Sequence, residues 1–169
     1  MKFLFIVMMF FFSIQGFSQF GVNIDCESQV VNNQYIEIDR IANPNNIWQI
    51  AIPNKPLFDA AHSPTHVMIT DANEPYPVND TSSFILKFER DEESYNLGGG
   101  NIQLSLSFWY KINSDTLTDY GKIEVSADNG LSWIDVMSED ETYGFHWMES
   151  KPVLSGNSNG WQYFSVDIS

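Results

Sequence analysis

The sequence predicts an all-β protein built as a β-sandwich or a barrel. Apolar and polar residues alternate along most apolar segments, as they do in half-buried strands, and clusters of Gly, Pro, Asn and Asp separate these segments. Beyond residue 18, no segment keeps a helical periodicity, and no repeat of about 20–50 residues indicates a propeller or solenoid. The 13 Phe, 7 Tyr and 5 Trp are enough large rings to fill the space between two sheets.

Residues 1–18 are predicted to be a signal peptide that is removed from the mature chain. Lys2 is their only charge, and an unbroken apolar run follows at 3–12. That run is shorter than the ~20 residues that span a bilayer. Gly16 and Ser18 supply the small residues that signal peptidase requires. We therefore expect cleavage after Ser18, a secreted or cell-surface protein, and no transmembrane span in the mature chain.

The mature chain is strongly acidic. Loss of Lys2 removes one positive charge and changes the formal net charge from −14 to −15. This acidity disfavours nucleic acid and anionic lipid as partners, since both need a basic surface, and it suits an exported protein that binds calcium. Cys26 is the only cysteine, so an internal disulfide is impossible. Its thiol is expected to be buried, free or paired with another chain.

Two segments follow the signal peptide. Residues 19–45 form a polar lead-in with one expected strand at 35–38, and residues 46–169 form the β-sandwich domain. The first strands expected in this domain lie at 48–52, 67–70 and 84–89. Loops that contain prolines, at 53–64 and 71–80, separate them.

The longest expected strand runs over 102–113 and should be central. Apolar side chains alternate there with polar ones, except that Trp109 falls on the polar side. A hairpin follows at 119–133, with Ile123 and Val125 on its apolar face. Asp128-Asn129-Gly130 should reverse the chain, because Asn and Gly tolerate the positive φ of tight turns, and Trp133 should open the returning strand.

The last part of the chain begins with an acidic, aromatic excursion at 137–150. A short strand is expected at 153–154, and a final one at 160–169 with Phe164, Val166 and Ile168 on one face. The chain stops at Ser169, directly after this aromatic-rich strand. An open strand invites a neighbour, so we expect the chain to be a fragment or to end before its sheet is complete.

Two pairs of residues have the spacing of known sites but not the surroundings. His62 and His66 are four apart, as zinc ligands on a helix are, but Pro64 would break that helix, so ordinary loop histidines are expected. Glu37 and Asp39 share one strand face, as glucanase carboxylates do, but the position of the third acid holds an alanine. We expect a solvated strand face there.

Acidic clusters are the candidate metal ligands. They lie at 91–93, at Asp115 with Asp119, and at Glu139, Asp140 and Glu141. Calcium takes about 6–8 oxygen ligands, and loops at the edge of a sandwich can supply them, although no cluster has EF-hand spacing. The two interpretations are a structural calcium ion and plain surface charge.

Exposed aromatic rings are the candidate ligand-binding residues. Trp109 lies on the polar side of its strand, and we expect Tyr143, Trp147 and Tyr163 to face outward as well. A flat row of such rings would stack on sugar faces or anchor a protein partner. The alternative is that Trp109 packs under a second loop or sheet layer.

Three stretches together resemble a known family. They are 47–58 with its continuation to residue 71, then 104–110, and the 119–133 hairpin with the closing strand 161–168. Their order is similar to MAM-like, concanavalin A-like jelly-roll modules of secreted bacterial surface proteins and adhesins, which type IX secretion often exports. The resemblance implies two antiparallel sheets packed face to face and a role in adhesion or in glycan or protein binding. The paired cysteines of animal MAM domains and the family's final strands are not in this sequence.

A second, local resemblance concerns the turn of the hairpin. Residues 126–133 fit the Asp-box of sialidase propellers, Ser-x-Asp-x-Gly-x-Ser/Thr-Trp. The resemblance implies that Asp128 bonds turn amides and that Trp133 packs beneath the hairpin. A single copy without blade repeats does not make a sialidase, so Asp128, Gly130 and Trp133 are expected to be structural.

The signal peptide, the strand pattern and the lack of a complete catalytic set predict a non-catalytic module for adhesion or binding, with a glycan or protein ligand. Two alternatives stay open. One is an accessory or catalytic piece of a secreted hydrolase, either a glycosidase or a peptidase, and the other is a spacer without a ligand.

Overall fold

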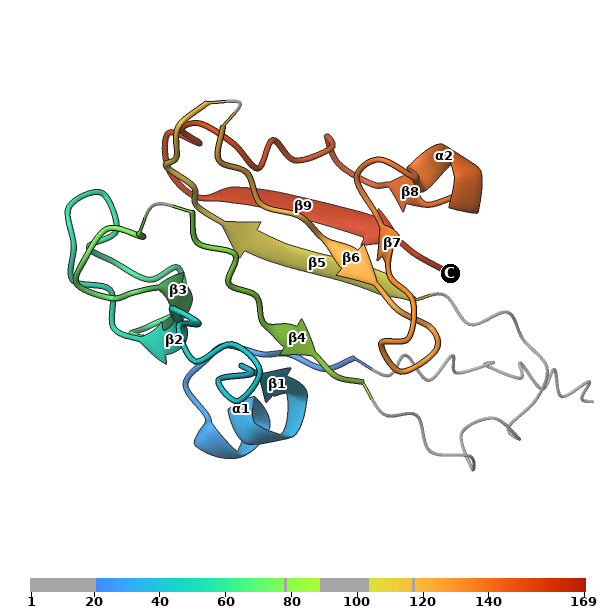
Figure 1. Ribbon diagram of the computed structural model, residues 1–169. Coiled ribbons are helices and arrows are strands. Elements are labelled where there is room, and N and C mark those ends of the chain that lie inside the picture. Colours follow the sequence, from blue (N-terminus) through green and yellow to red (C-terminus); the bar gives the residue numbers. More distant parts are fainter. Residues whose placement is uncertain (1–20, 78, 89–103, 117) are drawn as a thin grey trace, which may run out of the picture.

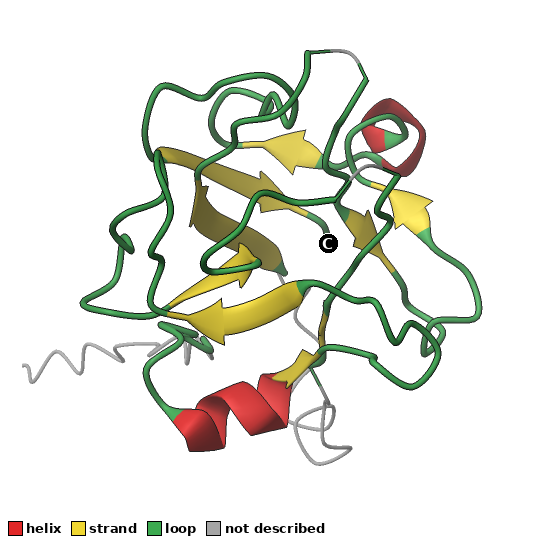
Figure 2. Cartoon of the chain, turned by 60° about the vertical axis from the view of Figure 1, so that its left-hand side comes forward, coloured by secondary structure: helices red, strands yellow, loops and turns green. Residues whose placement is uncertain are grey.

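The computed structural model describes residues 21–77, 79–88, 104–116 and 118–169. In this part of the chain strands predominate over helices, which confirms the predicted all-β character. Long loops connect short strands (Figure 2). The predicted signal peptide and the acidic residues at 91–93 lie outside the described residues.

The described strands form small antiparallel sheets. Three of these sheets are single pairs: β1 (Ile36–Glu37) with β4 (Ile85–Leu86), β2 (Trp48–Ala51) with β3 (Val67–Thr70), and β6 (Glu124–Val125) with β7 (Ile134–Asp135). The largest sheet has the order β5–β9–β8, with β5 at Ser105–Tyr110, β9 at Gln162–Asp167 and β8 at His146–Trp147. The sheets are small and unclosed, so the two-sheet sandwich stays a prediction.

Among the described strands, β9 is central in the largest sheet and β5 lies at its edge, which contradicts the prediction that the strand at 102–113 is central. β5 pairs with β9 from Ser105–Asp167 to Tyr110–Gln162, and β8 pairs with the other edge of β9. The aromatic-rich last strand therefore has a neighbour on each side (Figure 1).

The core lies on one face of β5 and β9. Phe164 and Val166 are fully buried there together with Val136, which follows β7. Phe164 lies edge-on to Phe108 with 4.0 Å between ring centroids. The β6–β7 hairpin covers this face in a second layer (Figure 1). The partly buried residues packed around this core are Leu106, Phe108, Tyr110, Ile123, Val125, Phe145, Trp147 and Ile168. The predicted apolar faces of both long strands are thus confirmed.

The described residues include two short helices, in segments where the sequence shows no sustained helical periodicity. The helix α1 (Gln29–Tyr35) has 7 residues, and the Ser28 hydroxyl accepts a hydrogen bond from the Val31 amide at its start. The helix α2 (Asp140–Tyr143) is a single turn of 4 residues that ends at Gly144, where φ is 75°. Helices of this length are too short to show a sustained periodicity in the sequence.

The predicted lead-in is tied to the rest of the chain. It contains α1 and β1, and β1 pairs with β4. The Arg40 guanidinium donates to the Trp48 carbonyl oxygen at 2.6 Å, and the Asn46 amide donates to the Ser83 carbonyl oxygen at 2.7 Å. Cys26 is half-buried and free, and burial raises the pKa of its thiol.

Two strand predictions after residue 119 need correction. The hairpin forms, but β7 begins at Ile134, so Trp133 belongs to the turn and does not open the strand. Side chains satisfy amides of this turn, and the strand ladder therefore does not need to continue into it. The strand expected at 153–154 is not formed. The Leu154 carbonyl oxygen accepts a backbone hydrogen bond from Gly121 at 2.7 Å, and Val153 is exposed.

Candidate ligand-binding site

Two exposed rings lie side by side on the face of β5 and β9 that points away from the core. Trp109 and Tyr163 are partners in the β5–β9 register, and strand alternation places both opposite Phe108 and Phe164. Their ring centroids are 5.2 Å apart with 48° between the planes. Trp109 is 47% exposed and Tyr163 is 43% exposed. The strand pairing therefore fixes two aromatic side chains at the surface.

Two more rings extend this pair. His62, from the loop between β2 and β3, stacks on Trp109 with 4.2 Å between centroids and 15° between planes. Trp161, just before β9, lies edge-on to His62 at 5.7 Å. We call the four side chains of Trp109, Tyr163, His62 and Trp161 the aromatic surface. His62 covers one side of Trp109, and about half of the Trp109 side chain remains open to a ligand.

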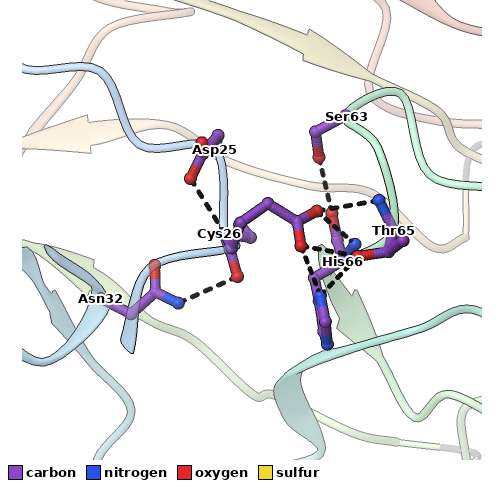
Figure 3. A network of polar contacts seen from close by, with 7 residues as sticks. Asp25, Cys26, Asn32, Ser63, Thr65 and His66 are labelled. Atoms are coloured by element: carbon purple, nitrogen blue, oxygen red, sulfur yellow. Dashed lines mark hydrogen bonds and ion pairs between the residues drawn. The ribbon is translucent and has the colours of Figure 1, made fainter. Parts of the chain in front are cut away.

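A polar network anchors the end of the loop that carries His62 (Figure 3). The Glu27 carboxylate accepts hydrogen bonds from the backbone amides of Thr65 and His66 at 2.8 and 2.7 Å. It also accepts from the Thr65 hydroxyl at 2.6 Å and contacts His66 Nδ1 at 2.7 Å. The His66 amide, followed by the Thr65 hydroxyl and the His66 ring, lowers the pKa of Glu27 to about 2. This carboxylate therefore stays ionised and holds the loop.

A buried lysine anchors the start of the same loop. Lys55 Nζ donates to the carbonyl oxygens of Thr70 and Glu74 at 2.6 and 3.3 Å. Burial lowers the pKa of Lys55, because desolvation disfavours its charged form. The ammonium also lies 5.3 Å from the centre of the Phe58 ring. The segment that carries Phe58 and His62 is thus fixed at both ends.

A hollow of about 390 Å³ is also built from this loop and from the segments next to β5 and β9. Lys111 and the two residues after it follow β5, and Gly160 and Asn159 precede Trp161 and β9. The hollow therefore shares its supporting segments with the aromatic surface. The residues that line it are Leu57, Asp59, Lys111, Ile112, Asn113, Asn157, Asn159 and Gly160.

Several polar side chains of the hollow are free to bind a ligand. The side chains of Asp59, Asn113 and Asn159 form no hydrogen bond with other described residues. The Asn157 side chain accepts from the Asn159 amide at 2.7 Å and keeps its NH₂ group available. The Lys111 ammonium lies 5.5 Å from the centre of the Phe58 ring. The hollow thus offers amide donors and acceptors, one carboxylate and one ammonium.

The other two predicted ligand-binding rings lie away from this surface. Trp147 is half-buried on the core face, with its ring 5.8 Å from Phe164, and its Nε1 donates to Asp140 at 2.9 Å. Tyr143 is 50% exposed and stacks on Phe145 at 5.8 Å. Both belong to the α2–β8 region at the opposite end of the β5–β9 pair (Figure 1).

The predicted calcium ligands do not converge on a metal site within the described residues. Asp140 pairs with Lys151 at 2.6 Å, and Asp119 accepts a hydrogen bond from the Tyr76 hydroxyl at 2.6 Å. Asp115, Glu139 and Glu141 are described too and form no group of three ligands with them. The structure therefore gives the calcium prediction no support in the part of the chain it describes.

The turn residues form a hydrogen-bonded unit. Asp128 accepts from the Ser132 amide at 2.9 Å and from the Ser132 hydroxyl at 2.6 Å. The Ser126 hydroxyl donates to Asp128 and accepts from the Gly130 amide, both at 2.8 Å. Gly130 has a φ of 83°, and a Cβ added there would lie 3.5 Å from the Trp133 ring. Through these contacts, Asp128, Gly130 and Trp133 stabilise the turn.

The remaining candidate pairs also have structural surroundings. His62 and His66 diverge, because one stacks on Trp109 and the other contacts Glu27. Glu37 forms an ion pair with Lys87. Asp39 accepts hydrogen bonds from the amides at 41 and 42, at 2.8 and 2.9 Å.

Sequence reasoning missed most of the hollow and half of the aromatic surface. Alternation along β5 identifies Trp109, but His62 and Trp161 come from loops, where no periodicity marks the exposed side. The only sequence feature that could have indicated the hollow is the Asn-rich turn at 157–159, because it lies close to β5. That proximity depends on the β5–β9 pairing, which is not local in sequence.

Comparison with known proteins gives no relative: no protein-family model, curated protein or solved structure matches the chain. The resemblance to MAM-like modules therefore stays a prediction.

Among the residues described, no helix has the length and apolar character needed to cross a membrane.

Proposed function

We propose that this chain is a secreted, non-catalytic β-sandwich module that binds a glycan on the aromatic surface and in the adjoining hollow. The observation that carries the proposal is the position of Trp109 and Tyr163, exposed side by side next to a hollow lined by free amide side chains. A sugar ring presents a C–H face that packs on an aromatic ring and hydroxyl groups that bond to amides. A glycan would use both parts of the site.

The size of the hollow favours a sugar over a protein partner. Its volume of about 390 Å³ falls in the range of roughly 300–1,000 Å³ that is usual for small-molecule sites. Protein interfaces bury about 800 Å² on each partner and require a broader surface. A hollow of this size can admit a sugar unit, and neighbouring units of the same glycan can lie on the aromatic surface.

The number of carboxylates in the hollow favours binding over hydrolysis. Glycosidases hold two carboxyl groups about 5–9 Å apart across the scissile bond. Asp59 is the single carboxylate among the described residues that line the hollow. A binding module needs no such pair, whereas the hydrolase alternative does.

A glycan array probed with the mature chain tests the proposal, followed by calorimetry with the glycan that binds best. We expect Trp109→Ala and Tyr163→Ala each to weaken binding by roughly tenfold, because each removes an exposed ring from the site. Both residues are on the outward face, so the variants should stay folded. Tyr143→Ala is the matched control, since it removes an equally exposed ring outside the site. A folded chain that binds no glycan, or equal losses in all three variants, would contradict the proposal.

A further inference from the structure

We infer that the glycan carries a carboxylate, as a uronic or sialic acid does, and that Lys111 binds this carboxylate in the hollow. The inference rests on the proposed glycan site and adds the class of sugar that the site selects. Its basis is the arrangement of charges in and around the hollow.

Lys111 differs from the other cationic side chains that the structure describes. Within the described residues its ammonium has no oxygen partner, and its contact is with the Phe58 ring at 5.5 Å. The others bond to oxygen: Arg40 to Trp48, Lys55 to Thr70 and Glu74, Lys87 to Glu37, Lys122 to Glu124 and Asp135, and Lys151 to Asp140. In a chain with 22 acidic and 8 basic residues, such a lysine leaves a positive charge available to a ligand.

The position of Lys111 directs this charge into the binding site. The side chain is half-buried and lines the hollow. The Phe58 ring supports its ammonium without neutralising it, because an aromatic face attracts a cation but carries no net charge. Asp59 lines the same hollow but does not pair with Lys111 in the described structure. An ammonium binds a carboxylate more strongly than it binds a neutral hydroxyl, so the hollow should prefer an acidic sugar.

The net charge restricts the kind of acidic glycan. Electrostatic interactions are screened over about 8 Å at physiological ionic strength. Inside the hollow a ligand therefore meets mainly the unpaired charges of Lys111 and Asp59, and the mature chain's net charge of −15 acts on whatever extends beyond it. A densely sulfated polymer would extend beyond the hollow and be repelled by the acidic chain. Isolated carboxylates on an otherwise neutral glycan avoid that repulsion, and the free amides at Asn113 and Asn159 can bond to its hydroxyls.

Matched pairs of sugars test the inference. The first pair is an oligosaccharide of alternating glucuronate and N-acetylglucosamine and its carboxyl-reduced form, in which glucose replaces glucuronate. The second pair is sialyllactose and lactose. We expect the mature chain to bind at least one acidic member about tenfold more tightly than its neutral partner. Lys111→Gln should abolish this preference and leave the weaker neutral binding, and Lys111→Arg should retain most of it.

Lys122→Gln is the matched control, because it makes the same change in net charge on the β6–β7 hairpin, where Lys122 already pairs with acidic residues. It should leave the preference intact. Equal binding within both pairs of sugars would overturn the acidic-sugar inference while the glycan-binding function stands. Equal loss of preference in Lys111→Gln and Lys122→Gln would also overturn it, because net charge alone would then explain the effect. Failure to bind any glycan would refute the proposed function itself.

Discussion

Asp128 holds the turn between β6 and β7 together through its carboxylate. The hydroxyl and the amide of Ser132 and the hydroxyl of Ser126 all donate to it. These donors, with the Ser132 hydroxyl first, lower the pKa of Asp128 from 3.8 to about 2. The same turn places Asn129 and Gly130 at positive φ, which these residue types tolerate. The ionised Asp128 and the Ser126 hydroxyl therefore hold the reversal together.

Replacement of Asp128 by Asn should lower the thermal unfolding midpoint at pH 7 by roughly 2–4 °C. The folded-state pKa lies below the unfolded one, so the carboxylate stabilises the fold above about pH 4. This contribution is lost as the pH falls through about 2. The difference between Asp128→Asn and the unaltered chain should therefore shrink as unfolding is followed from pH 7 to pH 2.

Glu149→Gln is the control for the Asp128 variant, because it removes the same charge from an exposed side chain. It should shift the midpoint little at any pH. Equal shifts in the two variants would show that net charge, and not the turn, explains the effect.

At the scale of elements, β9 connects the core to the candidate site. Its odd and even residues face opposite ways, so Phe164 enters the core while Tyr163 stays at the surface. The pairing with β5 repeats the arrangement with Phe108 and Trp109. The two strands that build the core therefore also position Trp109 and Tyr163 of the aromatic surface.

Replacing one side chain on each face of β9 by alanine should separate the role of this strand in the core from its role in the candidate site. Phe164→Ala should lower the free energy of unfolding by about 3–5 kcal/mol, because it opens a cavity beside Val136 and Val166 in a small core. Tyr163→Ala should cost far less, since that ring is 43% exposed. Urea unfolding at 25 °C measures both, and similar losses in the two variants would contradict the assignment of faces.

These elements also show what the sequence can and cannot predict. Strand positions and apolar faces follow from alternation, which is why the strand at 67–70 and the core face of 160–169 are predicted correctly. The order of strands in a sheet depends on contacts that are distant in sequence. β9 is central rather than β5 because β8, which contains Trp147, pairs with the edge of β9 that β5 leaves open. For the same reason alternation identifies Trp109, whereas the contribution of His62 to the site depends on a tertiary contact.

At the scale of the whole molecule, the lead-in at 19–45 supports the site from a distance. Glu27 precedes α1 and bonds to Thr65 and His66. The same loop brings His62 onto Trp109. The β1–β4 pair and the Arg40–Trp48 contact join this segment to the rest of the fold. The lead-in and the later strands therefore form one connected structure.

Glu27→Gln tests this connection, because an amide cannot replace all the acceptor sites of the carboxylate. We expect hydrogen exchange at the Thr65 and His66 amides to become about tenfold faster or more, while exchange at the β5 and β9 amides stays unchanged. Glycan binding should weaken as well, since His62 loses its fixed place on Trp109. The effect depends on the ionised carboxylate, whose pKa of about 2 keeps it charged at pH 7. Exchange at these two amides in the unaltered chain should therefore approach that of the variant only as the pH falls from about 4.5 towards 2. Unchanged exchange at both amides would show that the loop holds its position without the lead-in.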